Sequence, residues 1–140
     1  MSQILTAVSV VLSMFLVGCA SGPPTAEEFA KADYGTPITQ QAGQDKAQGW
    51  LKGVLKDPSS AQYDWGTVQQ GWARTAPIEG GKLIFGYRLD AKINARNSFG
   101  GYNGYKPYLF IFKNGELDGV WGEQVLGSGY SATSYMGRLK

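Results

Sequence analysis

The fold is decided by the stretch Leu83-Ile84-Phe85-Gly86-Tyr87-Arg88-Leu89-Asp90-Ala91-Lys92-Ile93-Asn94, in which apolar side chains recur at every second position. Successive side chains of a β-strand point to opposite faces of the sheet. A period of two therefore predicts a long strand over residues 82–93, with one face buried and the other largely in water. That arrangement is typical of an antiparallel sheet.

Two more strands are expected on the C-terminal side of this stretch, over residues 108–113 and 116–121. They are joined by Asn114-Gly115, a dipeptide that favours a tight hairpin because both residues tolerate positive φ. Upstream, after a turn expected over residues 57–60, Tyr63, Trp65 and Val68 favour a further strand that could reach Trp72. We therefore expect an antiparallel sheet of about four strands.

One helix is expected over residues 45–56, because its apolar residues fall on a single helical stripe: Ala47, Trp50, Leu51, Val54 and Leu55. Pro58 forbids its continuation. The predicted fold class is α+β, with one amphipathic helix packed on the sheet in a single domain over residues 45–140. Residues 122–140 are rich in Gly and Ser, and we expect them to be mostly irregular.

The N-terminal residues differ from the rest of the chain in charge and hydropathy. Residues 4–18 are uncharged and mostly apolar, yet shorter than the roughly 20 residues that span a bilayer. They end in Leu16-Val17-Gly18-Cys19, which resembles the lipobox of bacterial lipoproteins. The resemblance implies a signal peptide over residues 1–18, cleavage before Cys19, and attachment of diacylglycerol and a further acyl chain such as palmitate to that residue. The alternative is an ordinary secretory signal, or a weak membrane anchor, with an incidental cysteine.

Residues 19–44 contain Pro23, Pro24 and Pro37 and few large apolar residues, which predicts a flexible tether between the lipid and the domain. Fully extended, it would reach ~80 Å. Ala20 after the cysteine resembles the sorting pattern for the outer membrane. We expect a periplasm-facing position there, with the periplasmic face of the inner membrane or the cell surface as alternatives.

A segment dense in Gly, Asn and aromatic residues separates two of the expected strands, over residues 97–108. Glycine frees the backbone, and aromatic rings offer apolar faces suited to recognition. We interpret the segment as a candidate binding loop, with four candidate contact residues: Asn97, Phe99, Tyr102 and Tyr105. The alternative is a wide connection whose aromatic residues fold back over the sheet edge.

Composition argues against several functions. The net charge of +2 and scattered basic residues do not favour nucleic-acid binding. The chain has no histidine and one cysteine, so the commonest general base is missing and lipidation would consume the only thiol. We therefore expect no enzyme activity, no cofactor and no metal site. An aromatic platform for a glycan is an alternative, and would be formed by Trp50, Trp65, Trp72 and Trp121.

Three segments carry a second resemblance: residues 32–35 (ADYG), residues 55–63 (LKDPSSAQY) and residues 94–108 (NARNSFGGYNGYKPY). Together they resemble small lipoproteins of Gram-negative bacteria and their prophages. The resemblance implies placement in the envelope and transfers no catalytic residue. We expect a membrane-attached, non-catalytic component that binds an envelope protein. The alternatives are a prophage-derived exclusion or inhibitory lipoprotein, and a peptidoglycan binder; the oligomeric state is not predicted.

Overall fold

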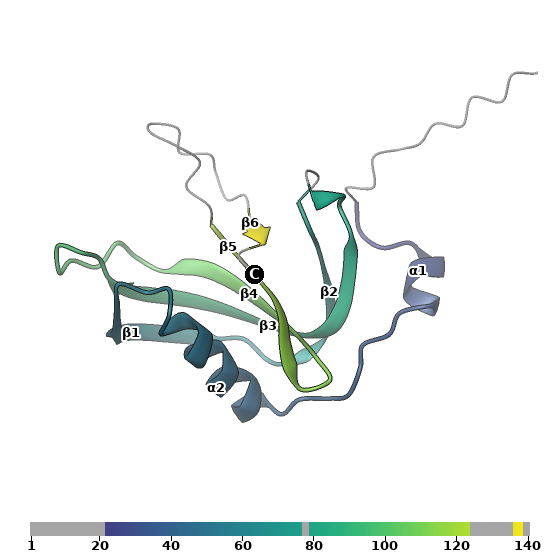
Figure 1. Cartoon of the computed structure of the whole chain (residues 1–140), viewed down its shortest axis with the longest axis horizontal. Coiled ribbons are helices and arrows are strands. Elements are labelled where there is room, and N and C mark those ends of the chain that lie inside the picture. The colour runs from purple at the N-terminus through teal and green to yellow at the C-terminus, as the bar shows by residue number, and fades with distance from the viewer. Residues whose placement is uncertain (1–21, 77–78, 124–135, 139–140) are drawn as a thin grey trace, which may run out of the picture.

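The computed structural model describes residues 22–76, 79–123 and 136–138. Two helices and six strands follow one another along these residues (Figure 1): α1 (Ala26–Ala30), α2 (Gln40–Leu51), β1 (Asp57–Trp65), β2 (Gln69–Arg74), β3 (Leu83–Arg96), β4 (Lys106–Lys113), β5 (Glu116–Glu123) and β6 (Met136–Arg138). The expected signal peptide and Cys19 lie outside the described residues.

All strand pairs are antiparallel, and the sheet order is β1-β3-β4-β5-β6. The predicted strand β3 is its organising element. β2 pairs with the first half of β3, from Leu83 to Arg88, and β1 pairs with the second half, from Ala91 to Arg96. The run that we expected to reach Trp72 is thus two strands, and the expected turn over residues 57–60 belongs to β1. β6 adds a short strand within residues 122–140, which we expected to be mostly irregular.

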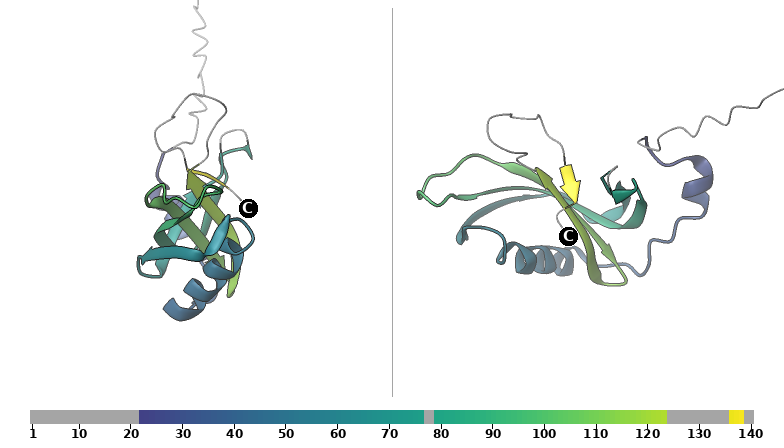
Figure 2. Two further views of the ribbon diagram at one scale, coloured as in Figure 1. Left: turned by 90° about the vertical axis from the view of Figure 1, so that its left-hand side faces the viewer. Right: turned by 45° about the horizontal axis from the view of Figure 1, so that its top comes forward.

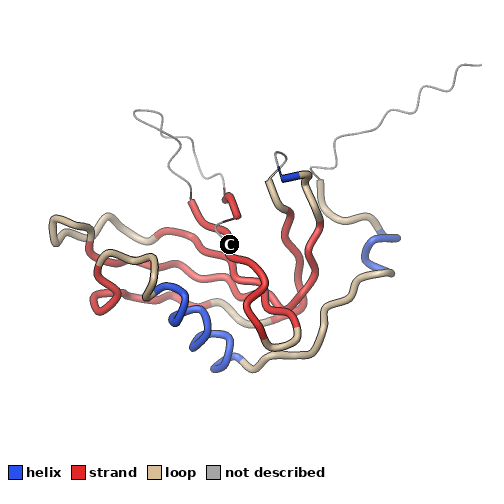
Figure 3. Tube along the Cα trace, in the orientation of Figure 1, coloured by secondary structure: helices blue, strands red, loops and turns tan. Residues whose placement is uncertain are grey.

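Helix α2 lies on one face of the sheet, which confirms the α+β architecture (Figures 1 and 3). The buried core beneath it comprises Ala47, Leu51, Leu89, Ala91, Ile93, Phe110, Phe112 and Val120. The helix begins at Gln40, where the Thr39 hydroxyl accepts a hydrogen bond from the Ala42 N–H. The helix start expected at residue 45 was therefore placed too late, because Thr39 already caps the helix. Val54 lies beyond its end and is 49% exposed.

The opposite face of the sheet is less exposed to solvent than the alternation predicted. A second buried cluster comprises Ala73, Leu109, Ile111 and Trp121, with Ile84 packed against it. The Trp121 indole N–H donates to the carbonyl of Arg74 at 2.8 Å, so its one polar group is satisfied. Strand β3 also carries polar side chains, including the ion pair of Arg88 with Asp90.

The predicted hairpin turn between β4 and β5 is confirmed. Asn114 has φ of 52° and Gly115 has φ of 79°, and Lys113 pairs with Glu116 across the turn. Positive φ at both central residues is the requirement of a type I′ turn.

Residues 22–36, which we expected to belong to the flexible tether, lie against the sheet; we call them the N-terminal clamp. The Arg74 side chain donates to the Gly22 carbonyl at 2.8 Å, and the Thr36 N–H donates to Asn114 Oδ1 at 3.0 Å. Between these points, Asp33 forms an ion pair with Lys113 at 3.0 Å.

Two aromatic rings of the N-terminal clamp meet one ring of β3. The rings of Phe29 and Tyr34 lie 5.9 and 5.5 Å from that of Phe85, within the usual range for aromatic pairs. Gly35 completes the fit, because it has φ of +70° and an added Cβ would stand 2.6 Å from Asn114 Oδ1. Gly35 thus shapes a docked segment here.

Candidate functional site

The candidate binding loop connects the end of β3 to the start of β4 and comprises residues 97–105, since residues 106–108 already belong to β4. It lies at the end of the molecule farthest from α1, as two views agree (Figures 1 and 2). Strand β3 is 14 residues long, which at ~3.3 Å per residue places its two ends about 43 Å apart along the strand. The sequence-predicted contact residues therefore stand at one tip of the domain.

The side chain of Asn97 organises this loop. Its Oδ1 accepts hydrogen bonds from the backbone N–H groups of Phe99 and Gly101, at 2.9 and 3.1 Å, and its Nδ2 donates to Asn103 Oδ1 at 2.9 Å. The Asn97 backbone N–H also donates to the Gly101 carbonyl at 2.8 Å. Such side-chain bonds to nearby backbone groups fix a turn. Asn97 is thus a structural residue of the loop rather than a free contact group.

Tyr102 folds back onto the sheet. Its hydroxyl donates to the Ser60 carbonyl of β1 at 3.0 Å, and its ring lies 5.6 Å from the guanidinium carbon of Arg96, a cation–π distance. An isolated bridge also pairs Arg96 with Tyr102. For this residue the structure agrees with the alternative interpretation, in which aromatic side chains cover the sheet edge, although 43% of Tyr102 stays exposed.

Phe99 behaves differently, because 97% of its surface is exposed. Tyr105 is 53% exposed. The loop therefore presents an almost fully exposed ring at its tip and a second aromatic side chain nearer β4. Two contributors to the loop were missed by sequence reasoning: Asn103, the partner of Asn97, and Ser60, which we had assigned to a turn. The sequence does contain a signal for the organising role of Asn97: Gly101 stands four residues after it.

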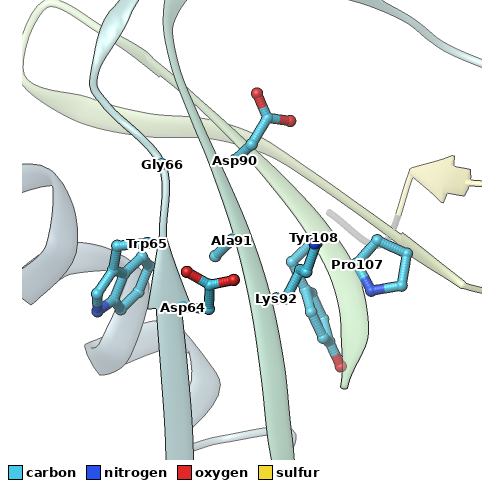
Figure 4. A pocket seen from close by; sticks show the side chains of 8 residues that line it. All are labelled: Asp64, Trp65, Gly66, Asp90, Ala91, Lys92, Pro107 and Tyr108. Carbon is cyan, nitrogen blue, oxygen red and sulfur yellow. The ribbon is translucent and has the colours of Figure 1, made fainter. Parts of the chain in front are cut away.

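A shallow groove of about 340 Å³ crosses β1, β3 and β4 (Figure 4). Trp65, Ala91 and Tyr108 stand opposite one another in the strand register, and all three line this groove. Burial raises the pKa of the Tyr108 hydroxyl, and the Glu123 carboxylate raises it further. The Tyr108 side chain is therefore a neutral hydrogen-bonding group at physiological pH.

The four tryptophans do not share one surface. Trp50 and Trp65 both contact Phe110, at 6.3 and 6.4 Å between ring centroids, on the face that α2 covers. Trp121 is buried in the cluster on the opposite face. Trp72 lines a separate polar hollow beside Arg88.

Among the described residues, no helix is long and apolar enough to cross a membrane, and no group of three or more His, Cys, Asp or Glu residues could hold a metal ion. Comparison of the chain with protein families, curated proteins and solved structures finds no match. The resemblance to small envelope lipoproteins stays a prediction.

Proposed function

We propose that this chain is a non-catalytic envelope lipoprotein that is lipidated at Cys19 and binds a protein partner through the 97–105 loop. The attachment rests on Leu16-Val17-Gly18-Cys19 at the end of an apolar run. More than one acyl chain is needed for lasting attachment, at about 0.8 kcal/mol per buried CH₂. Ala20 supports the outer membrane as the destination, with the domain facing the periplasm.

The observation that carries the binding proposal is the exposure of Phe99. Contact of a phenylalanine ring with water is unfavourable, and the hydrogen bond from the Phe99 N–H to Asn97 Oδ1 restrains the Phe99 backbone before any partner arrives. A preorganised loop loses less conformational entropy on binding than a mobile one. Aromatic side chains are also enriched in the buried centres of protein interfaces. We therefore assign Phe99 as the principal contact, with Tyr105 beside it.

Photocrosslinking in intact cells tests the loop. A photoreactive amino acid at Ser98 should capture a discrete partner, and Phe99→Ala in the same chain should abolish the capture. The matched control is Lys92→Ala, because Lys92 is an exposed β3 residue away from the loop. Undiminished capture with a folded Phe99→Ala variant would exclude the loop as the contact.

Attachment is tested separately with Cys19→Ser. This variant should lose palmitate labelling and leave the membrane fraction, because no other acylation site of this kind exists in a chain with one cysteine. A membrane fraction that is unchanged, with no label on the wild type, would contradict lipidation.

A second candidate function is favoured by the groove between Trp65 and Tyr108 (Figure 4). Aromatic rings in the lining of a groove suit stacking against a sugar ring. Titration of the protein with peptidoglycan fragments, followed by tryptophan fluorescence, should then give a saturable change that Trp65→Ala removes. A flat titration would eliminate the glycan proposal while leaving the loop proposal intact.

A further inference from the structure

The N-terminal clamp determines where a lipid on Cys19 can lie relative to the domain. Three Cα–Cα steps separate Cys19 from Gly22, and at ~3.8 Å per step they span at most about 11 Å. Gly22 is itself held, because its carbonyl accepts a hydrogen bond from the Arg74 side chain at 2.8 Å. Pro24, two residues further on, is buried. The attachment point is therefore close to β2.

Arg74 fixes this start of the clamp to the connection between β2 and β3. Its guanidinium also donates to the Gly81 carbonyl at 3.2 Å and lies 3.7 Å from the Glu28 carboxylate. Only 14% of the Arg74 side chain is exposed, so these contacts are partly shielded from water. One side chain thus ties the clamp, β2 and the β2–β3 connection together.

Strand β3 sets the distance from this point to the candidate binding loop. Arg74 pairs with Leu83, the first residue of β3, whereas the loop starts after Arg96, its last residue. In Figure 1, helix α1 of the clamp lies to the right of the sheet and the candidate binding loop lies at its left end. The docked clamp also removes most of the ~80 Å of reach that a free tether would supply.

We infer that the domain stands on the membrane with the β2–β3 connection toward the lipid headgroups and the 97–105 loop pointing away, so that Phe99 meets a protein surface displaced from the bilayer. The inference rests on the proposed lipidation of Cys19. It names the kind of partner: one that offers an apolar pocket outside the headgroup layer, such as the aqueous part of an envelope protein. A partner site embedded at bilayer depth does not fit this geometry.

The test uses the full lipidated protein in vesicles whose lipids carry a headgroup quencher. Two variants, each with one free cysteine besides the acylated Cys19, receive a fluorophore: Lys82→Cys, exposed at the β2–β3 connection, and Ser98→Cys, exposed in the loop. We expect strong loss of fluorescence at residue 82 and little at residue 98. Equal loss at both positions, or a greater loss at residue 98, would overturn the orientation.

A flotation assay on the same vesicles separates the two proposals. Protein that does not float with the lipid contradicts the anchor, and with it the orientation. Protein that floats but shows equal quenching contradicts the orientation alone.

Arg74→Met addresses the clamp directly. It should reduce quenching at residue 82, because Gly22 and Glu28 lose their shared partner. Lys92→Met is the control, since Lys92 is an exposed basic residue of β3 outside the clamp. Circular dichroism verifies that both variants keep the sheet. Unchanged quenching in a folded Arg74→Met protein would show that Arg74 does not hold the domain in place.

Discussion

The N-terminal clamp and the 97–105 loop are both irregular segments with glycine and aromatic residues, yet they use their rings in opposite ways. In the clamp, Phe29 and Tyr34 meet Phe85 of β3. In the loop, Phe99 remains 97% exposed. The clamp and the loop therefore have similar compositions, although the first packs on the sheet and the second projects into solvent. The difference lies in whether the sheet supplies an apolar partner.

Phe85→Ala should give the largest effect, because it removes the ring that receives both aromatic residues of the clamp. We expect the free energy of unfolding to fall by about 2–3 kcal/mol, somewhat less than for a fully buried phenylalanine. Phe99→Ala should change it by less than about 0.5 kcal/mol. Urea denaturation of the mature chain with Cys19→Ser measures both. Similar losses for the two variants would contradict the contrast between clamp and loop.

Asn97→Ala should have the next largest effect. It leaves the N–H groups of Phe99 and Gly101 without their acceptor, and we expect a loss of about 1–2 kcal/mol. Asn103→Ala is the control, because it removes only the side-chain bond to Asn97. Amide exchange at residues 99 and 101 should accelerate in the first variant and stay near wild type in the second. Equal exchange in both would show that Asn97 does not order the loop.

Sequence patterns predicted those elements whose conformation depends mainly on the residues of one short segment. The alternation along residues 82–93 identified β3, and Asn114-Gly115 identified the turn, because strand period and positive φ are properties of short segments. The helix was found from its apolar stripe, although its start was missed. Residues 40–44 show no such stripe, and Thr39 alone signalled the cap.

Long-range contacts explain what the sequence did not reveal. The N-terminal clamp contains proline and glycine and was interpreted as a tether, because nothing in residues 22–36 indicates that Phe85 and Asn114 lie beside them. The loop residues were predicted as a group, but the contacts that each one makes depend on residues distant in the sequence. Tyr102 reaches Ser60, which is 42 positions away, whereas Phe99 projects into solvent.

Tyr102→Phe tests the part of the loop that resembles the clamp. It removes the hydrogen bond to the Ser60 carbonyl and keeps the ring near Arg96. Because the residue is 43% exposed, we expect a loss of about 0.5 kcal/mol, at the lower end for a hydrogen bond. Tyr105→Phe should cost less still. Thermal unfolding of the two variants side by side measures the difference; a larger loss for Tyr105→Phe would reverse the assignment of the two residues.

Acidification should produce the smallest effect and should act on the clamp rather than the loop. The Thr25 N–H bonded to Glu28 holds the pKa of that carboxyl below its usual 4.5, and the Gly35 N–H, with the Lys113 ammonium, holds the pKa of Asp33 below 3.8. A carboxyl group whose pKa is lower in the folded state stabilises the fold at pH values above its ordinary pKa. This stabilisation is lost as the pH falls through the folded-state pKa. Residues 97–105 contain no carboxylate side chain.

Lowering the pH from about 6 to about 3 should therefore loosen residues 22–36 while the loop keeps its protection. Hydrogen exchange, corrected for the intrinsic pH dependence of the rate, compares the two segments in one sample. The double variant Glu28→Gln with Asp33→Asn should lose this pH response, because its side chains cannot ionise. A clamp that exchanges equally at both pH values in the wild type would show that its aromatic contacts with Phe85 hold it without the carboxylates.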